Sequence, residues 1–199
     1  MQLPPELVQE WITPGERVLD LGCGSGELLR QLTDCKQIRG YGIEIDPDAI
    51  SACVRAGVNV IEQDLDKGLS NFTDNSFDTV VMTQTLQAVH FPHLLIRELL
   101  RVGKKGIVSF PNFGHWRCRL HLGLRGQMPV SKFLPYQWYD TPNIHFCTIT
   151  DFESLCQAEG IRILNRRYLS ATRQSTALAR RWPNLCSFTA IYLIAPATE

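Results

Sequence analysis

Near its beginning the chain reads Val18-Leu19-Asp20-Leu21-Gly22-Cys23-Gly24-Ser25-Gly26. An apolar run of β type, Arg17–Leu21, leads into three glycines that alternate with other residues, and the amphipathic segment Glu27–Cys35 follows. Glycine tolerates both a sharp turn and a ligand lying against the backbone. The sequence therefore predicts a strand, a ligand-binding turn and a helix, the unit with which many α/β folds bind ligands at the carboxyl ends of their strands.

The same alternation of apolar strands with amphipathic helices continues along the chain. Further strands are predicted at Ile38–Ile45, Val58–Glu62, Asp78–Thr83, Gly106–Phe110, Ile161–Leu169 and Ser187–Ala195. Further helices are predicted at Pro4–Ile12, from the N-cap Asp46 through Ala56, at Pro92–Val102, and from the capping box Thr150–Glu153 to Glu159. The last two strands are expected to pair antiparallel, because no helix-length amphipathic run separates them. We therefore expect one α/β domain over residues 1–199: a Rossmann-like, doubly wound, mostly parallel sheet of about seven strands with an antiparallel edge strand.

Residues 111–147 depart from this pattern. The segment is too long for an ordinary loop, and its aromatic residues show no clean period, so we expect an inserted lid or binding segment. Its aromatic residues are Trp116, Phe133, Tyr136, Trp138 and Tyr139, and its basic residues are Arg117, Arg119, Arg125 and Lys132 against the single acid Asp140. Aromatic residues in a lid often form its own small core, but together with arginine they are also typical of protein interfaces.

Composition excludes several classes of protein. Hydrophobic residues make up 44% and charged residues 20% of the 199 residues, which is typical of globular proteins. No apolar run of about 18 residues indicates a membrane span, and no basic segment followed by an apolar one indicates a signal peptide. The seven cysteines are scattered and never form C-x-x-C. We therefore expect a cytoplasmic protein with reduced thiols and no metal site.

The net charge of zero hides an asymmetry. Residues 1–90 contain 14 acids and 6 bases, whereas residues 91–199 contain 6 acids and 14 bases. The two halves either neutralise each other within the fold or leave a basic face for an acidic partner. A nucleic-acid groove is not favoured, because the isoelectric point is only 6.9 and no long Lys/Arg run occurs.

The glycine-rich turn itself indicates which ligand binds. Its spacing is G-x-G-x-G, with Glu27 where the dinucleotide fingerprint G-x-G-x-x-G has its third glycine. Asp20 precedes the turn, and a carboxylate there would repel a pyrophosphate but attract the ammonium and sulfonium groups of S-adenosylmethionine. A P-loop is excluded because Gly-Lys-Ser/Thr is missing. The sequence therefore predicts a site for S-adenosylmethionine or S-adenosylhomocysteine.

The ends of the next three strands supply the rest of this site. Glu44, 18 residues beyond Gly26, can accept both ribose hydroxyls. Asp64 can accept from the adenine amino group while the Leu65 N–H meets a ring nitrogen; the alternative is that Asp64 is a plain helix or turn cap. Gln84 is expected near the methionine end of the ligand, or else is a polar strand end in water. The full predicted set is Asp20, Gly22, Cys23, Gly24, Gly26, Glu44, Ile45, Asp64, Leu65 and Gln84.

No pair of catalytic groups is indicated by spacing, so the catalytic residues stay unassigned. Methyl transfer to an amine or hydroxyl usually needs a base. His115 and His145 lie in the insert beside Asn112 and Asn143, and either can serve. Each can equally be a buried, hydrogen-bonded structural histidine.

Residues 15–110 resemble the class I S-adenosylmethionine-dependent methyltransferases, and longer motifs resemble the MetW family of methionine-biosynthesis proteins. These motifs are Arg101–Gly103, Phe110-Pro111-Asn112-Phe113-Gly114-His115-Trp116, Met128-Pro129-Val130-Ser131, and Pro135-Tyr136 with Trp138-Tyr139-Asp140-Thr141-Pro142-Asn143-Ile144-His145. The resemblance implies a partner or regulatory subunit of the homoserine O-acyltransferase MetX. The alternative is an active methyltransferase on a small-molecule acceptor, so whether the chain is itself an enzyme stays open, as does a homo-oligomer.

Overall fold

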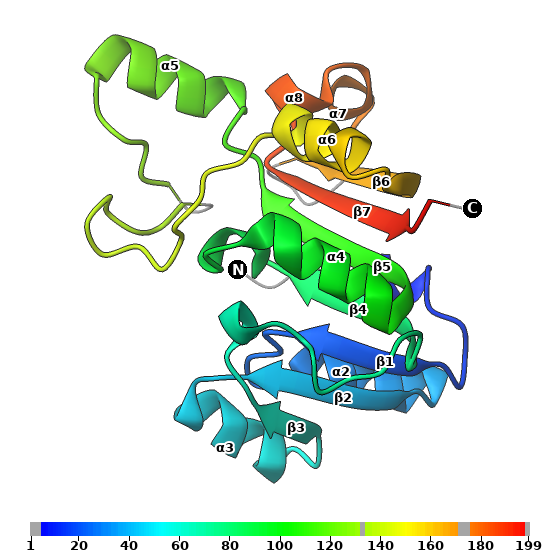
Figure 1. Ribbon diagram of the computed structural model, residues 1–199. Coiled ribbons are helices and arrows are strands. Elements are labelled where there is room, and N and C mark those ends of the chain that lie inside the picture. Colours follow the sequence, from blue (N-terminus) through cyan, green and yellow to red (C-terminus); the bar gives the residue numbers. More distant parts are fainter. Residues whose placement is uncertain (1–4, 132–133, 171–175, 198–199) are drawn as a thin grey trace.

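The computed structural model describes residues 5–131, 134–170 and 176–197. Within these residues seven strands form one sheet in the order β3-β2-β1-β4-β5-β7-β6 (Figure 1). The strands are β1 Arg17–Leu21, β2 Arg39–Glu44, β3 Asn59–Glu62, β4 Phe77–Thr83, β5 Gly103–Pro111, β6 Arg162–Leu169 and β7 Thr189–Ala195. Strands β1 to β5 are parallel, and β7 is antiparallel to both β5 and β6. The predicted fold class is confirmed, with the antiparallel strand β7 one place inside the edge strand β6.

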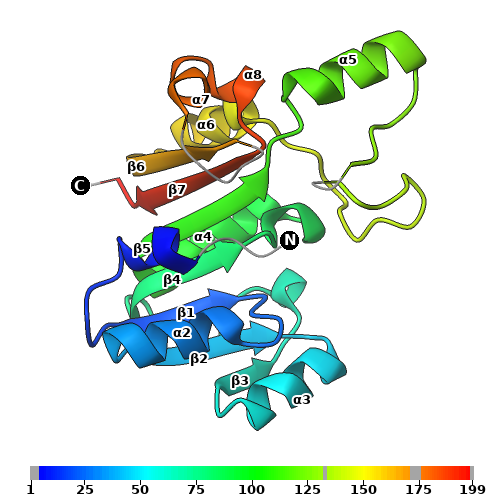
Figure 2. The same ribbon diagram turned by 180° about the vertical axis from the view of Figure 1, so that it is seen from behind.

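Helices cover both faces of this sheet (Figures 1 and 2). The helices, with two short 3₁₀ helices labelled η, are α1 Pro5–Gln9, α2 Glu27–Lys36, α3 Pro47–Arg55, η1 Leu65–Lys67, η2 Leu86–Ala88, α4 Pro92–Val102, α5 Trp116–Arg125, α6 Ile149–Ala158, α7 Ala177–Arg181 and α8 Pro183–Cys186. Helices α4 and α6 lie on the face turned to the viewer in Figure 1, and α1 and α2 lie on the opposite face. None of the helices in the described part of the chain is long and apolar enough to cross a membrane.

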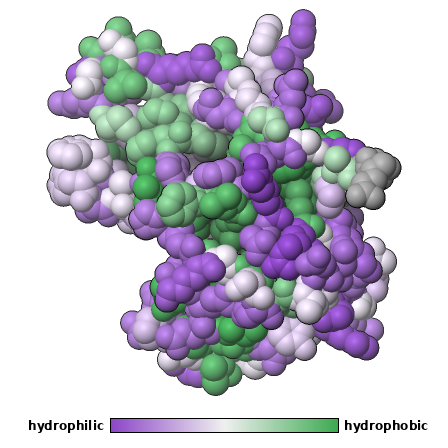
Figure 3. Space-filling model, viewed as in Figure 1, coloured by the Kyte–Doolittle hydropathy of each residue, from purple (hydrophilic) through white to green (hydrophobic). Residues whose placement is uncertain are grey.

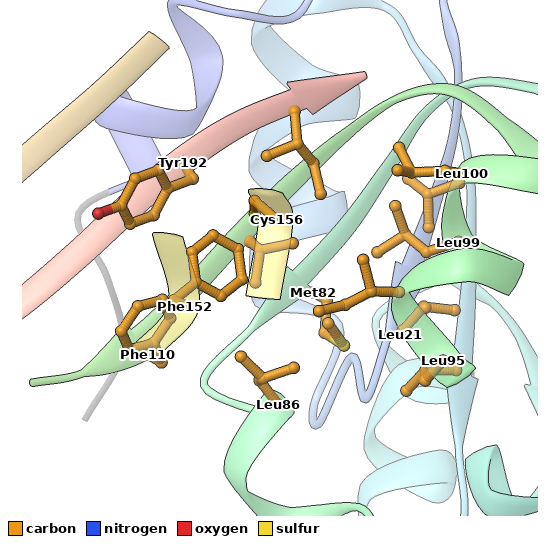
Figure 4. Packing of buried hydrophobic residues seen from close by; sticks show 14 of the residues in the cluster. Leu21, Met82, Leu86, Leu95, Leu99, Leu100, Phe110, Phe152, Cys156 and Tyr192 are labelled. Carbon is orange, nitrogen blue, oxygen red and sulfur yellow. The ribbon is translucent and has the colours of Figure 1, made fainter. Parts of the chain in front are cut away.

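The core consists of two layers because strands buried on both faces present alternate side chains to each. On the α4 and α6 side, the leucines of α4 pack over Leu21 and Met82, and Phe110, Phe152 and Tyr192 form an aromatic cluster (Figure 4). On the other side, Val18 belongs to a cluster with residues of α1, α2 and α3. This packing fixes the carboxyl ends of β1 to β4 side by side.

Most element bounds agree with the sequence, and α4 agrees residue for residue. The capping box of α6 is the main correction: Thr148 and Asp151 form it, two residues before the predicted Thr150 and Glu153. Because α6 begins at Ile149, the side chain of this residue points into the core and is buried. Strand β5 begins directly at the end of α4 rather than at Gly106. Helix α1 is shorter than predicted, and the predicted first residue, Pro4, lies outside the described residues.

The insert contains a helix that the sequence pattern did not predict, α5. From Trp116 to Arg125 apolar residues alternate one by one with arginine, histidine and glycine, so the sequence lacks the period of a helix that packs one face on a core. Two short helices, α7 and α8, lie between β6 and β7, but the predicted antiparallel pairing of those strands is confirmed. Two of the insert's basic and aromatic residues, Lys132 and Phe133, lie outside the described residues.

Candidate functional site

The glycine-rich turn joins β1 to α2 through three residues in the left-handed region. Gly22, Gly24 and Gly26 have φ angles of 75°, 54° and 75°, which favour glycine because it lacks a Cβ. A Cβ at Gly22 would lie 2.6 Å from Thr85 Oγ1, so this glycine permits close contact with the loop after β4. A Cβ at Gly24 would meet nothing within 4 Å. The turn therefore packs against the loop after β4 at Gly22 and borders open space at Gly24.

Glu44, at the end of β2, holds the turn in place. Its Oε2 accepts from the Gly24 N–H at 2.8 Å, and its Oε1 accepts from the N–H groups of Ile45 and Asp46 at 2.8 and 3.1 Å. A carboxylate has about four lone-pair positions, and these bonds use three. One position on Oε2 remains for a ligand hydroxyl, and a second bond would require the Gly24 contact to open.

Asp20 is the most unusual titratable group near the turn. It lies within β1, is 1% exposed, and its Oδ1 has no hydrogen-bond partner. Burial, and then the charge of Glu44, raises the pKa of Asp20 to about 7. Leaving a buried polar atom unpaired costs about 1–3 kcal/mol, and more for a charged group. A cation placed against Asp20 would offset this cost, whereas a further anion would increase it.

Cys23 packs beneath the turn, between the turn and α3. Its Sγ lies 3.8 Å from Cys53 Sγ of α3, and Cys53 Sγ is 3.1 Å from the carbonyl oxygen of Gly24. A Cβ on Gly42 of β2 would collide with Cys23. Burial raises the pKa of both thiols. These cysteines therefore act as small apolar packing residues here, and the sequence did not identify Cys53 or Gly42 as neighbours of the turn.

The loops after β3 and β4 hold the remaining predicted residues. Asp64 caps η1 by accepting from the Asp66 N–H at 3.0 Å through Oδ1, and Leu65 begins that short helix. Gln84 follows β4 with φ 59°, and its backbone N–H bonds Ser109 O at 3.0 Å. Because β3, β2, β1 and β4 are neighbours in the sheet, their carboxyl ends bring the predicted set to one edge.

Gln87, which the sequence did not single out, connects this edge to the insert. Its side-chain Nε2 donates to Gln84 O at 2.7 Å, and its backbone carbonyl oxygen accepts from the N–H groups of Ile144 and His145 at 2.8 and 3.0 Å. The side chain is 7% exposed. The sequence gives no signal of this role, because the contact with Ile144 and His145 depends on tertiary structure.

The two candidate histidines have different surroundings. His115 is buried, stacks on Phe188 with ring centroids 3.7 Å apart, and caps α5 by accepting from the Arg117 N–H at 3.1 Å. Burial, and then the charge of Arg117, lowers the pKa of His115 to about 4. His145 is less buried, and its Nε2 donates to His90 O at 3.2 Å. The geometry favours a structural role for His115 over that of a general base. His145 lies where the insert returns to the loop after β4.

Comparison with known proteins identifies the family. The family model described as "Methionine biosynthesis protein MetW" matches residues 5–194. The chain belongs to the MetW family. A bifunctional methionine biosynthesis protein MetXA/MetW of Rhodopirellula baltica is 37% identical over 164 residues, which cover 78% of this chain and 26% of that protein. A ribosomal protein L11 methyltransferase of Burkholderia mallei is 39% identical over 77 residues, 38% of this chain and 25% of that protein. The chain thus spans about a quarter of these relatives' length.

Solved structures with the same fold are S-adenosylmethionine-dependent methyltransferases and related proteins. One from Methanosarcina mazei superposes over the full length of both chains with a TM-score of 0.71 and 18% identity. The cyclase SpnF superposes with a TM-score of 0.69 and 20% identity over 98% of this chain and 81% of that protein. At such identities the likeness shows the fold alone. The chain therefore has the class I methyltransferase fold.

Proposed function

We propose that the chain binds S-adenosylmethionine or S-adenosylhomocysteine at the carboxyl edge of its sheet and acts as a partner or regulatory subunit of the homoserine O-acyltransferase MetX. The unpartnered, buried oxygen of Asp20 is the observation that carries the ligand part of this proposal. The relative that joins MetXA and MetW in one polypeptide supports the partner part.

Charge and shape at the turn both favour the adenosyl ligand. The charge that acts on Asp20 is that of a second acid, Glu44, so a cationic methionine moiety is attracted and a pyrophosphate is repelled. The open side of Gly24 gives the ligand room against the backbone. The free position on Glu44 Oε2 is suited to a ribose hydroxyl, and the second carboxylate oxygen of Asp64 remains for adenine.

The insert supplies the surface that a partner subunit needs. Many of the large apolar residues that are exposed in the described structure lie on it: Trp116, Leu120, Leu122, Leu124, Val130, Tyr136, Trp138, Tyr139, Ile144 and Phe146. Trp138 and Tyr139 are each 71% exposed. Aromatic and leucine side chains gathered on one surface segment are typical of binding sites for other proteins.

The β4 loop gives ligand and partner a physical connection. Gln87 bonds Gln84 on the ligand side and the backbone of Ile144 and His145 on the insert side. A ligand that repositions Gln84 would act on the returning end of the insert through this contact. Coupling requires the ligand to bind the docked and undocked states with different affinity. The adenosyl ligand would then regulate the acyltransferase as a derivative of the pathway's end product.

An active methyltransferase is the second candidate. The ribosomal protein L11 methyltransferase relative and the solved methyltransferases favour it. The cyclase SpnF, however, has the same fold and a different reaction named for it, so the fold does not define the chemistry. With a pKa near 4, His115 is neutral at pH 7 but is a weak base. This leaves the methyltransferase alternative with His145 as its candidate base.

Two measurements test the proposal. Calorimetric titration is expected to show binding of S-adenosylmethionine and S-adenosylhomocysteine and none of NADH, because NADH carries a pyrophosphate. Co-expression with the acyltransferase of the same organism is expected to yield a stable complex on gel filtration. Tight NADH binding with no response to the adenosyl ligands would overturn the ligand assignment. Absence of a complex, together with methyl transfer to a small molecule, would favour the second candidate.

A further inference from the structure

Helix α5 carries an apolar stripe that the described part of the chain leaves uncovered. Trp116, Leu120 and Leu124 are spaced four residues apart, which places them on one face of the helix. They are 44%, 50% and 77% exposed. Arg117, His121 and Arg125 line the same shallow groove. Figure 3 shows hydrophobic patches at this end of the molecule, bordered by hydrophilic ones.

The helix is anchored at its first turn and projects from the body beyond it (Figures 1 and 2). His115 stacks on Phe188, Arg119 Nε donates to Gly114 O at 2.6 Å, and Cys118 is the only residue of α5 that is buried. The contrast with α4 is large, because α4 buries five of its apolar residues. The anchoring contacts fix the start of α5, so its stripe is presented in a defined direction rather than on a free tail.

The charges around the stripe indicate what kind of partner surface would cover it. No acidic residue occurs in the sequence between positions 111 and 139. In the described structure neither Arg117 nor Arg125 forms an ion pair with a carboxylate. The Arg117 guanidinium lies 5.4 Å from the Trp116 ring, beside the stripe. A complementary surface is therefore an apolar groove with carboxylates along its rim.

We propose that the face of α5 formed by Trp116, Leu120 and Leu124 inserts into an acid-rimmed apolar groove on the acyltransferase. This rests on the proposed function, because the fused relative is what makes an acyltransferase the expected protein neighbour. Within the insert, α5 is then the part that contacts the acyltransferase. The returning segment around Ile144 and His145 is already bonded to Gln87 and serves to connect the docked helix to the ligand edge.

Two other occupants fit the charges less well. A second copy of the chain would bring its own arginines against those of the first, and like charges in an interface are repulsive. A membrane surface attracts longer amphipathic helices with a large basic face, whereas α5 has ten residues and three arginines, one of which bonds the backbone. Both are outcomes of the test below.

The test uses the chain of residues 1–199 with the acyltransferase and compares Leu→Glu substitutions on α5 with one at a site whose exposure matches that of Leu120. Leu120 on α5 is 50% exposed and Leu164 on the edge strand β6 is 49% exposed. We expect Leu120→Glu and Leu124→Glu to weaken the complex at least tenfold, as for a central interface residue, and Leu164→Glu to leave it unchanged. Arg125→Glu should weaken it and reduce its dependence on salt. All four variants should bind S-adenosylmethionine as the wild type does, which shows that they fold.

The outcomes separate this inference from the proposed function. If the wild type forms the complex and the α5 variants bind as tightly as Leu164→Glu, the docking face is wrong and the partner assignment stands. If the wild type forms no complex, both are wrong. Sedimentation of the chain as a dimer that Leu120→Glu dissociates would make a second copy the occupant. Binding of the wild type, but not Leu120→Glu, to anionic phospholipid vesicles would replace the protein partner with a lipid surface.

Discussion

Replacement of Asp20 with asparagine separates the stability cost of its buried carboxylate from its contribution to binding. The pKa of Asp20 is raised from 3.8 to about 7, first by burial and then by Glu44. Between these two values the folded protein keeps a proton that the unfolded chain has released. Stability therefore falls as the pH rises from about 4 to about 7 and levels off above. At about 1.4 kcal/mol per pKa unit, the ionised group costs roughly 4 kcal/mol by pH 8.

Asparagine has the same shape and no charge. Relative to wild type, Asp20→Asn should therefore gain about 2–3 kcal/mol of unfolding free energy as the pH is raised from 5 to 8. The same change removes the charge that attracts the ligand, so affinity for S-adenosylmethionine at pH 8 should fall about tenfold to a hundredfold. Wild-type affinity should decrease below pH 7 by up to about tenfold per pH unit, because the cation competes with a proton. The variant should lack this dependence.

Urea unfolding and calorimetric titration at pH 5, 6.5 and 8 measure both effects. Asp34→Asn is the control, because Asp34 is 67% exposed on α2 and its change should alter neither profile. Equal pH dependence of stability in wild type and Asp20→Asn would show that the carboxylate is not isolated in the folded protein. A changed stability profile with unchanged ligand affinity would show that Asp20 does not contact the cation.

Three further predictions concern the site and the insert. Glu44→Ala should weaken binding of the adenosyl ligands by roughly 1–3 kcal/mol in calorimetry, because the Gly24 N–H of the turn and the N–H groups of Ile45 and Asp46 lose their acceptor, and the ribose loses one as well. Unchanged binding would mean that β2 does not define the site. Gly24→Val should abolish binding while helix content by circular dichroism persists. Gly160 also has a left-handed φ but lies away from the site, so Gly160→Val should introduce similar backbone strain and leave binding intact. His115→Ala should lower the free energy of unfolding by about 1–3 kcal/mol through loss of the cap and the ring stack. It should also remove the stability that wild type loses as the pH falls from 6.5 toward 4, because the folded pKa of His115 is depressed to about 4; an identical acid profile in urea unfolding would contradict this.

The parts of the fold that local chemistry determines were predictable. Helix α4 has proline at its start and a continuous apolar face, so its bounds follow from the sequence. The capping box of α6 was misplaced because two Thr-x-x-acid patterns overlap, and burial of Ile149 selects the earlier one. Helix α5 could not be found from periodicity, since its apolar residues alternate with polar ones and, apart from Cys118, are not buried.

The site shows the same division. The glycine spacing and the acids Asp20 and Glu44 were identified because each is tied to a strand end. Their surroundings were not predictable: Glu44 turns its oxygens toward backbone N–H groups, and the buried Oδ1 of Asp20 is left without a hydrogen-bond partner. Gln87 was missed because it matters only through contacts with Gln84 and the distant residue His145.

The acyl-transfer rate of the homoserine O-acyltransferase, measured with and without this chain, tests the central claim most directly. We expect a higher rate when the chain is present, a further change when S-adenosylmethionine or S-adenosylhomocysteine is added, and loss of that ligand effect with Asp20→Asn. A rate that is the same with and without the chain, at concentrations where both proteins are folded, would contradict the account.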